Sequence, residues 1–152
     1  MENMKKASFS IKINASKEKV WNALWTDANY REWTKVFCEG SYAVSDWKEG
    51  SKILFLAGDQ GGMYSTITKK VPHECMFFTH IGMVKDNVEL PVDEETKKWT
   101  GATENYTLTE KDGVTELLVN MDITEEHYNY FKDAFPKGLE KVKAIAENQV
   151  ND

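Results

Sequence analysis

The last quarter of the chain carries one long helical pattern, and this feature constrains the fold more than any other. Apolar side chains recur there at steps of three and four residues: Tyr128, Phe131, Phe135, Leu139, Val142 and Ala146. The spacing predicts an amphipathic helix over residues 124–149, about 39 Å long if unbroken. Pro136 lies inside it and removes one backbone hydrogen bond, so we expect a kink or a break there. A stripe of this length must be buried against a second layer of structure.

The start of the chain predicts a strand followed by two short helices. Residues 8–14 alternate between apolar and polar side chains, as a half-buried strand does. Ser16 stands where a helix N-cap belongs, ahead of an apolar stripe that contains Val20, Trp21, Leu24 and Trp25. A second short helix is predicted from Thr26 to Trp33.

Between these helices and the long one, the pattern is that of antiparallel strands joined by short turns. The strands are predicted at residues 53–57, 63–71, 75–81, 102–110 and 114–122. Asp112-Gly113 between the last two is a strong hairpin signal. Strands and helices segregated in this way indicate an α+β fold built on an antiparallel meander.

One stretch fits neither pattern. The run between Gly82 and Gly101 is highly charged and contains Pro91, so we predict a long functional or mobile loop that ends in Trp99. With 152 residues the chain has room for one domain. We place that domain at residues 8–149, after a flexible tail of residues 1–7.

Composition excludes several classes of partner. The net charge of −6 disfavours nucleic acid and anionic membranes, and no apolar run is long enough for membrane insertion. The only arginine, Arg31, rules out a multi-arginine anion clamp. The N-terminus lacks the apolar region of a secretory signal, which favours a cytoplasmic location. Cys38 and Cys75 do not make a disulfide framework.

The chain is rich in aromatic residues, with five Trp, six Tyr and seven Phe. The strand alternation assigns one set of side chains to the concave face of the sheet: Ile53, Phe55, Cys75, Phe77, Thr79, Tyr106, Leu108, Leu117, Val119 and Met121. From these and from the last helix we predict eight ligand-binding residues around an apolar cavity: Phe55, Tyr64, Phe77, Thr79, Trp99, Tyr106, Phe131 and Phe135. The alternative is that these side chains pack on one another and leave no cavity.

Signals for catalysis and for metal binding are absent from the sequence. His73 follows Pro72 in a turn, and His80 is predicted to point away from the cavity because it alternates with Thr79. His127 lies near acidic residues, but no metal-ligand spacing occurs. No G-x-S-x-G elbow and no phosphate-binding glycine motif is present. We therefore predict no catalytic residue, no metal and no cofactor.

Several short motifs, in their order, resemble a known superfamily. They are Ile11-Lys-Ile-Asn-Ala-Ser16, Val20-Trp21-Asn-Ala-Leu24, Trp33, Trp47-Lys-Glu-Gly50, Val71-Pro72 and Gly113-Val-Thr-Glu-Leu117. From about Ser8 to Asn148 the chain resembles the START-like, helix-grip (SRPBCC) superfamily. The most similar branch is that of the activators of the 90-kDa heat-shock protein ATPase.

The resemblance implies a curved antiparallel sheet of six or seven strands wrapped around the C-terminal helix, with an apolar cavity between them. Our leading hypothesis is non-catalytic binding of a small hydrophobic or amphipathic molecule in that cavity. One alternative is a protein-interaction module that activates a chaperone ATPase. The other is a cyclase or hydrolase of aromatic polyketides, for which Tyr106, Thr79 and Tyr64 are the candidate polar residues.

Overall fold

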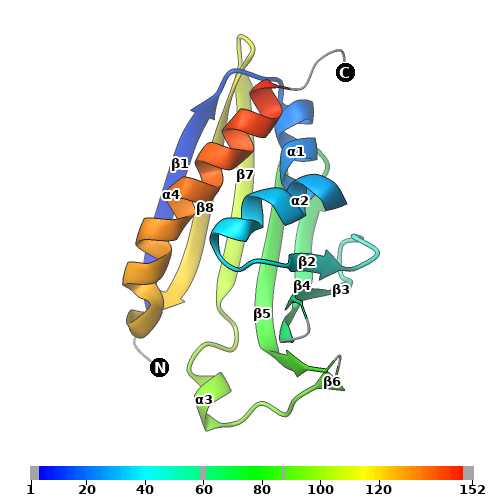
Figure 1. Ribbon diagram of the computed structural model, residues 1–152, viewed down its shortest axis with the longest axis vertical. Helices are drawn as coiled ribbons and strands as arrows, with labels where there is room; N and C mark the ends of the chain where they lie inside the picture. The colour runs from blue at the N-terminus through cyan, green and yellow to red at the C-terminus, as the bar shows by residue number, and fades with distance from the viewer. Residues whose placement is uncertain (1–3, 59–60, 87, 149–152) are drawn as a thin grey trace.

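A single curved antiparallel sheet forms the frame of the molecule in the computed structural model, which describes residues 4–58, 61–86 and 88–148 (Figure 1). Its strands lie in the order β1-β8-β7-β5-β4-β3-β2, and β6 pairs with the end of β5. Their bounds are β1 (Met4–Ile13), β2 (Ser41–Val44), β3 (Lys52–Ala57), β4 (Gly62–Val71), β5 (Cys75–Lys85), β6 (Val88–Glu89), β7 (Thr103–Lys111) and β8 (Val114–Thr124).

The helices α1, α2 and α4 lie on the concave side of this sheet, whereas α3 lies beyond its end near the start of β7. Their bounds are α1 (Lys17–Trp25), α2 (Asp27–Trp33), the 3-10 turn η1 (Thr34–Val36), α3 (Glu94–Lys97) and α4 (Glu125–Glu147). Figure 1 shows α4 running obliquely along the β1–β8 side, with α1 and α2 near its C-terminal end. Ser16 caps α1 as predicted, because its hydroxyl accepts the Lys19 backbone N–H.

The predicted fold class is confirmed: the fold is α+β, with two short helices after the first strand and one long helix at the end. β1 begins at Met4, so residues 4–7 belong to the sheet and not to a tail, while residues 1–3 and 149 lie outside the described part of the chain. The segment predicted as one long loop is partly regular, because it contains the end of β5, β6 and α3. In the described ranges, no helix is long and apolar enough to cross a bilayer.

Of the kink or break expected at Pro136, the break does not occur, because α4 continues through this residue. Pro136 is exposed, and so is Lys132, whose carbonyl loses its helical donor. Water can pair with that carbonyl on the solvent side. The buried side of the helix carries Phe135, Leu139 and Val142, so packing holds the helix together where the backbone bond is missing.

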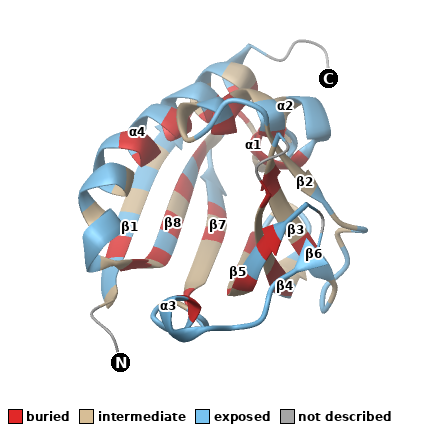
Figure 2. Ribbon diagram, turned by 60° about the horizontal axis from the view of Figure 1, so that its bottom comes forward, coloured by how far each residue is buried: buried red, intermediate tan, exposed pale blue. Residues whose placement is uncertain are grey.

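An aromatic core fills the space between the sheet and the helices α1, α2 and α4. Trp25 contacts the rings of Phe78 and Tyr106 at centroid distances of 5.6 and 4.9 Å, and Phe135 stacks on Phe9 at 5.0 Å. Buried residues alternate with more exposed ones along the strands, for example in β5 and β8 (Figure 2). This core fills the end of the sheet near α1 and α2. It does not fill the end where β8 leads into α4.

Candidate functional site

A pocket of about 740 Å³ is lined by residues of the end of β8, the start of α4 and the segment that contains α3. Figures 1 and 2 show β8 leading into α4 at this end of the sheet, with α3 near the start of β7. It is lined by Met63, His80, Met83, Asp93, Glu95, Thr96, Lys98, Trp99, Ala102, Glu104, Met121, Asp122, Ile123, Thr124, Glu125, Glu126, His127 and Phe131. Its volume is within the range of small-molecule sites.

The wall of the pocket is largely apolar. Three methionines reach it from three strands: Met63 from β4, Met83 from β5 and Met121 from β8. Trp99 closes it from the segment after α3, and Phe131 closes it from the second turn of α4. Unbranched methionine side chains adapt to differently shaped guests, so this wall suits an apolar or amphipathic ligand.

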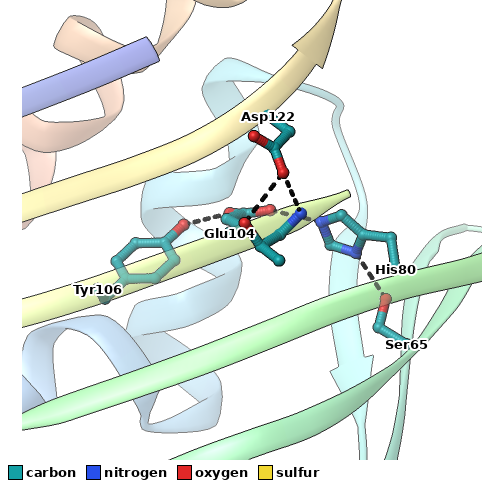
Figure 3. A network of polar contacts seen from close by, with 6 residues as sticks. Ser65, His80, Glu104, Tyr106 and Asp122 are labelled. Carbon is teal, nitrogen blue, oxygen red and sulfur yellow. Dashed lines mark hydrogen bonds and ion pairs between the residues drawn. The ribbon is translucent and has the colours of Figure 1, made fainter. Parts of the chain in front are cut away.

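Four polar residues form one continuous network across strands β4, β5 and β7 (Figure 3). Ser65 lies directly opposite His80 in the β4–β5 ladder, and its Oγ is 2.7 Å from His80 Nδ1. His80 Nε2 is 3.0 Å from Glu104 Oε1, and the Tyr106 hydroxyl lies 2.5 Å from Glu104 Oε2. Ser65 is 0% exposed and His80 is 6% exposed, whereas the Glu104 side chain keeps 18% of its surface accessible.

The chemistry of each group sets the direction of these hydrogen bonds. The carboxylate of Glu104 can only accept, so His80 Nε2–H and the Tyr106 hydroxyl donate to it. In the neutral ring, His80 Nδ1 then accepts the hydroxyl of Ser65. Burial raises the pKa of Tyr106, as do the charge of Glu104 and its hydrogen bond, so the phenol stays a donor. His80 therefore positions Glu104, which presents an acceptor to the pocket.

A second carboxylate, that of Asp122, connects three strands at the rim of the pocket. Asp122 accepts both the backbone N–H and the hydroxyl of Thr103, at 3.0 and 3.1 Å, and its other oxygen lies 2.8 Å from Lys6 Nζ. Burial opposes ionisation of Asp122, but the hydrogen bonds from Lys6 and Thr103 outweigh burial and lower its pKa. Asp122 thus links β1, β7 and β8 beside the start of α4.

We expect the substitution Ser65→Ala to lower the free energy of unfolding by about 1–3 kcal/mol, because it leaves His80 Nδ1 buried without its partner. Urea denaturation followed by circular dichroism measures the change. Ser10→Ala, at an exposed position of β1, is the matched control and is expected to change stability by less than about 0.5 kcal/mol. Equal stability of the two variants would contradict the network.

The structure separates the eight predicted ligand-binding residues into three groups. Trp99 and Phe131 line the pocket. A second group, deeper in the aromatic core, consists of Phe55, Tyr106 and Phe135. The third group, which does not line the pocket, consists of Tyr64, Phe77 and Thr79.

The predicted orientation of β5 is wrong. Met76, Phe78 and His80 are buried on the concave side, whereas Phe77 and Thr79 are only half-buried. The strand alternates regularly from Met76 to Val84, but Met76, Phe77 and Phe78 are all apolar, so the pattern does not tell which face of β5 is buried.

The contacts of the third group agree with an outward orientation. Lys69 Nζ lies 5.5 Å from the ring of Phe77, and Lys52 Nζ lies 5.6 Å from the ring of Tyr64. The Tyr64 ring covers Gly82, where an added Cβ would come within 2.7 Å of it. Lysine ammonium groups are strongly hydrated, so these rings lie on the solvent side of the sheet.

Sequence reasoning missed His80 and Glu104. The alternation that correctly assigned Tyr106 and Leu108 to the concave face of β7 also assigns Glu104 to it, so this residue could have been found. His80 carried no such signal, because β5 has apolar residues on both faces and the sequence pattern does not set its phase. Within the described ranges, no three His, Cys, Asp or Glu side chains cluster as metal ligands.

Comparison with known proteins identifies one family and many solved structures with a similar fold. The sequence profile of the family described as Activator of Hsp90 ATPase homolog 1-like protein matches residues 14–147. No curated protein matches the sequence closely enough to count as a relative. Among solved structures, a protein from Mesorhizobium loti is 15% identical, with a TM-score of 0.75 over 97% of this chain and 100% of that one.

Two solution structures show the same fold. The Aha1 dimer from Colwellia psychrerythraea is 20% identical, with a TM-score of 0.72 over 97% of this chain and 99% of that chain. A protein from Cytophaga hutchinsonii is 25% identical, with a TM-score of 0.69 over 99% of both chains. These similarities cover nearly the whole length of the chain.

Proposed function

Because the chain belongs to the family of Activator of Hsp90 ATPase homolog 1-like proteins, we propose that its pocket binds a small amphipathic molecule without changing it chemically. One observation carries the proposal: a pocket of about 740 Å³ has an apolar wall and a carboxylate held in place by His80 and Tyr106. An apolar cavity with a few fixed polar groups is the usual form of a small-molecule site.

The geometry favours binding over catalysis. Both nitrogens of His80 are engaged by Ser65 and Glu104, so the imidazole has no nitrogen left to exchange a proton with a guest. Ser65 is fully buried and out of reach of a substrate. Of the residues considered for a cyclase or hydrolase, Tyr64 and Thr79 do not line the pocket, and the hydroxyl of Tyr106 already donates to Glu104.

A pocket-filling substitution tests the proposal. Phenylnaphthylamine is an uncharged fluorophore that brightens in apolar surroundings, and we expect it to bind the unmodified protein. Met63→Trp adds bulk to the pocket wall and is expected to weaken this binding at least about tenfold, or ~1.4 kcal/mol. Fluorescence titration measures the dissociation constant.

The neighbouring residue supplies the control. Tyr64→Trp introduces the same side chain one position along β4, outside the pocket lining, and is expected to leave the dissociation constant unchanged within about twofold. Thermal unfolding verifies that both variants fold. Absence of binding to the unmodified protein, or equal weakening in the two variants, would remove the proposal.

The family description favours a second candidate, a module that acts on a chaperone ATPase. Exposed apolar side chains beside the pocket offer a surface for such a partner: Val88, Leu90 and Val92. One assay, of ATP hydrolysis by purified Hsp90, distinguishes the two functions. A stimulation that survives Met63→Trp but is lost on replacing Val88 and Leu90 by Ser would favour the surface over the pocket.

A further inference from the structure

The charges around the pocket are strongly unequal. Among the described residues that line it, six are acidic and one is a lysine. Three of the acids are engaged locally: Asp122 pairs with Lys6, Glu95 pairs with Lys98, and Asp93 caps α3 through the Thr96 backbone N–H. Glu125 and Glu126 lie in the first turn of α4, and Glu104 is held by His80 and Tyr106 rather than by a lysine, so its negative charge acts on a guest.

Glu104 differs from the other two in depth and in rigidity. It lies near the start of β7, a strand flanked by β8 and β5, and it pairs with Met121 in the β7–β8 ladder. Its side chain is mostly buried. His80 and Tyr106 hold its two oxygens from two directions, so it cannot turn away from a guest (Figure 3). A fixed carboxylate in a partly dehydrated pocket interacts more strongly with a guest charge than an exposed one does.

One feature of the pocket would favour an anion, namely the N-terminus of α4. Its unpaired backbone N–H groups carry a partial positive charge. Glu125 and Glu126 occupy its first turn and oppose that charge at the same place. The N-terminus of α4 therefore does not reverse the negative electrostatic potential that Glu104 gives the pocket.

From this arrangement we infer that the pocket selects amphipathic molecules with a protonated amine head group over those with a carboxylate, and that Glu104 is the residue that selects them. The inference rests on the proposed function, because it names the class of ligand for the same pocket. The apolar part of the guest would lie against Met63, Met121 and Phe131, and the ammonium group would face Glu104.

Three probes with one skeleton test the selection: naphthylethylamine, naphthylethanol and naphthylacetic acid. At about pH 8 the first is a cation, the second is neutral and the third is an anion, while imidazole groups are ordinarily neutral. Isothermal titration calorimetry at low salt should give the order amine, alcohol, acid, with the amine at least about tenfold tighter than the acid.

Glu104→Gln keeps the size of the side chain and removes its charge. We expect the ratio of amine to acid affinity to fall to about threefold or less, with affinity for the alcohol nearly unchanged. Glu116→Gln makes the same charge change at an exposed position of β8 outside the pocket and should leave the ratio as it was. If Glu104→Gln does not fold, the ranking of the three probes by the unmodified protein still tests the selection.

The outcomes distinguish this inference from the proposed function. If neither phenylnaphthylamine nor any of the three naphthyl compounds binds, the proposed function fails. If the compounds bind but the acid binds as tightly as the amine, the pocket remains a binding site and the selection is wrong. An amine preference that persists in a folded Glu104→Gln variant would overturn the role of Glu104.

Discussion

Phe135→Ala is expected to lower the free energy of unfolding by about 3–5 kcal/mol, the range observed when a buried phenylalanine is truncated. Phe135 is 2% exposed and stacks on Phe9 of β1. Its ring also contacts those of Phe37 and Tyr106, at centroid distances of 5.2 and 6.5 Å. The substitution would thus remove one side chain that contacts β1, β7 and the segment after η1 at the same time.

Urea denaturation of the purified variants measures this loss, and Phe77→Ala provides the comparison. Phe77 is half-buried on the outer side of β5, so its truncation should cost only about 1 kcal/mol. The pair also tests the orientation of β5, because the sequence predicted that both rings face the cavity, Phe77 from its strand and Phe135 from the last helix. Equal losses for the two variants would contradict the faces that the structure assigns.

The order and type of the elements could be predicted because they depend on local periodicity. The stripe from Tyr128 to Ala146 has a period that only a helix can bury on one side, and Asp112-Gly113 specifies a tight turn whatever surrounds it. Pro136 does not break the helix, because a proline on the exposed side of a packed helix removes only one backbone hydrogen bond, and water can pair with the carbonyl that is left.

The site was less predictable because it depends on register and on segments far apart in the chain. A change of phase by one residue reverses which side chains face inward, and β5 carries apolar residues on both faces, so Phe77 and Thr79 were predicted to face inward in place of Phe78 and His80. The pocket itself is closed by Trp99, in a segment without periodicity, and by the start of α4. Its volume follows from how these parts meet, which no local pattern encodes.

Two buried tyrosines should make the protein sensitive to alkali. Burial raises the pKa of Tyr30, with a smaller contribution from the charge of Glu104, and burial also raises the pKa of Tyr106. The native state therefore keeps both phenol protons at a pH where the unfolded chain, with tyrosine pKa values of about 10, releases them. Their stabilising contribution is complete below about pH 10 and is lost as the pH rises above it.

Each of the two tyrosines is expected to reduce the free energy of unfolding by about 1.4 kcal/mol per pH unit above about pH 10, or ~2.7 kcal/mol per unit together. Burial and then Cys38 also raise the pKa of Tyr130, but its ring is 47% exposed, so we assign it no part of this slope. Urea denaturation at a series of values from roughly pH 9 to pH 12 measures the slope.

Tyr30→Phe is the sharper variant for this experiment, because Tyr106 also holds Glu104 and its replacement would disturb the network. Removing the Tyr30 hydroxyl should halve the slope, to about 1.4 kcal/mol per pH unit, while leaving the aromatic contacts with Trp33 and Phe55 in place. Stability that stays constant up to about pH 12, or a slope that Tyr30→Phe does not change, would show that these phenols are not held protonated in the core.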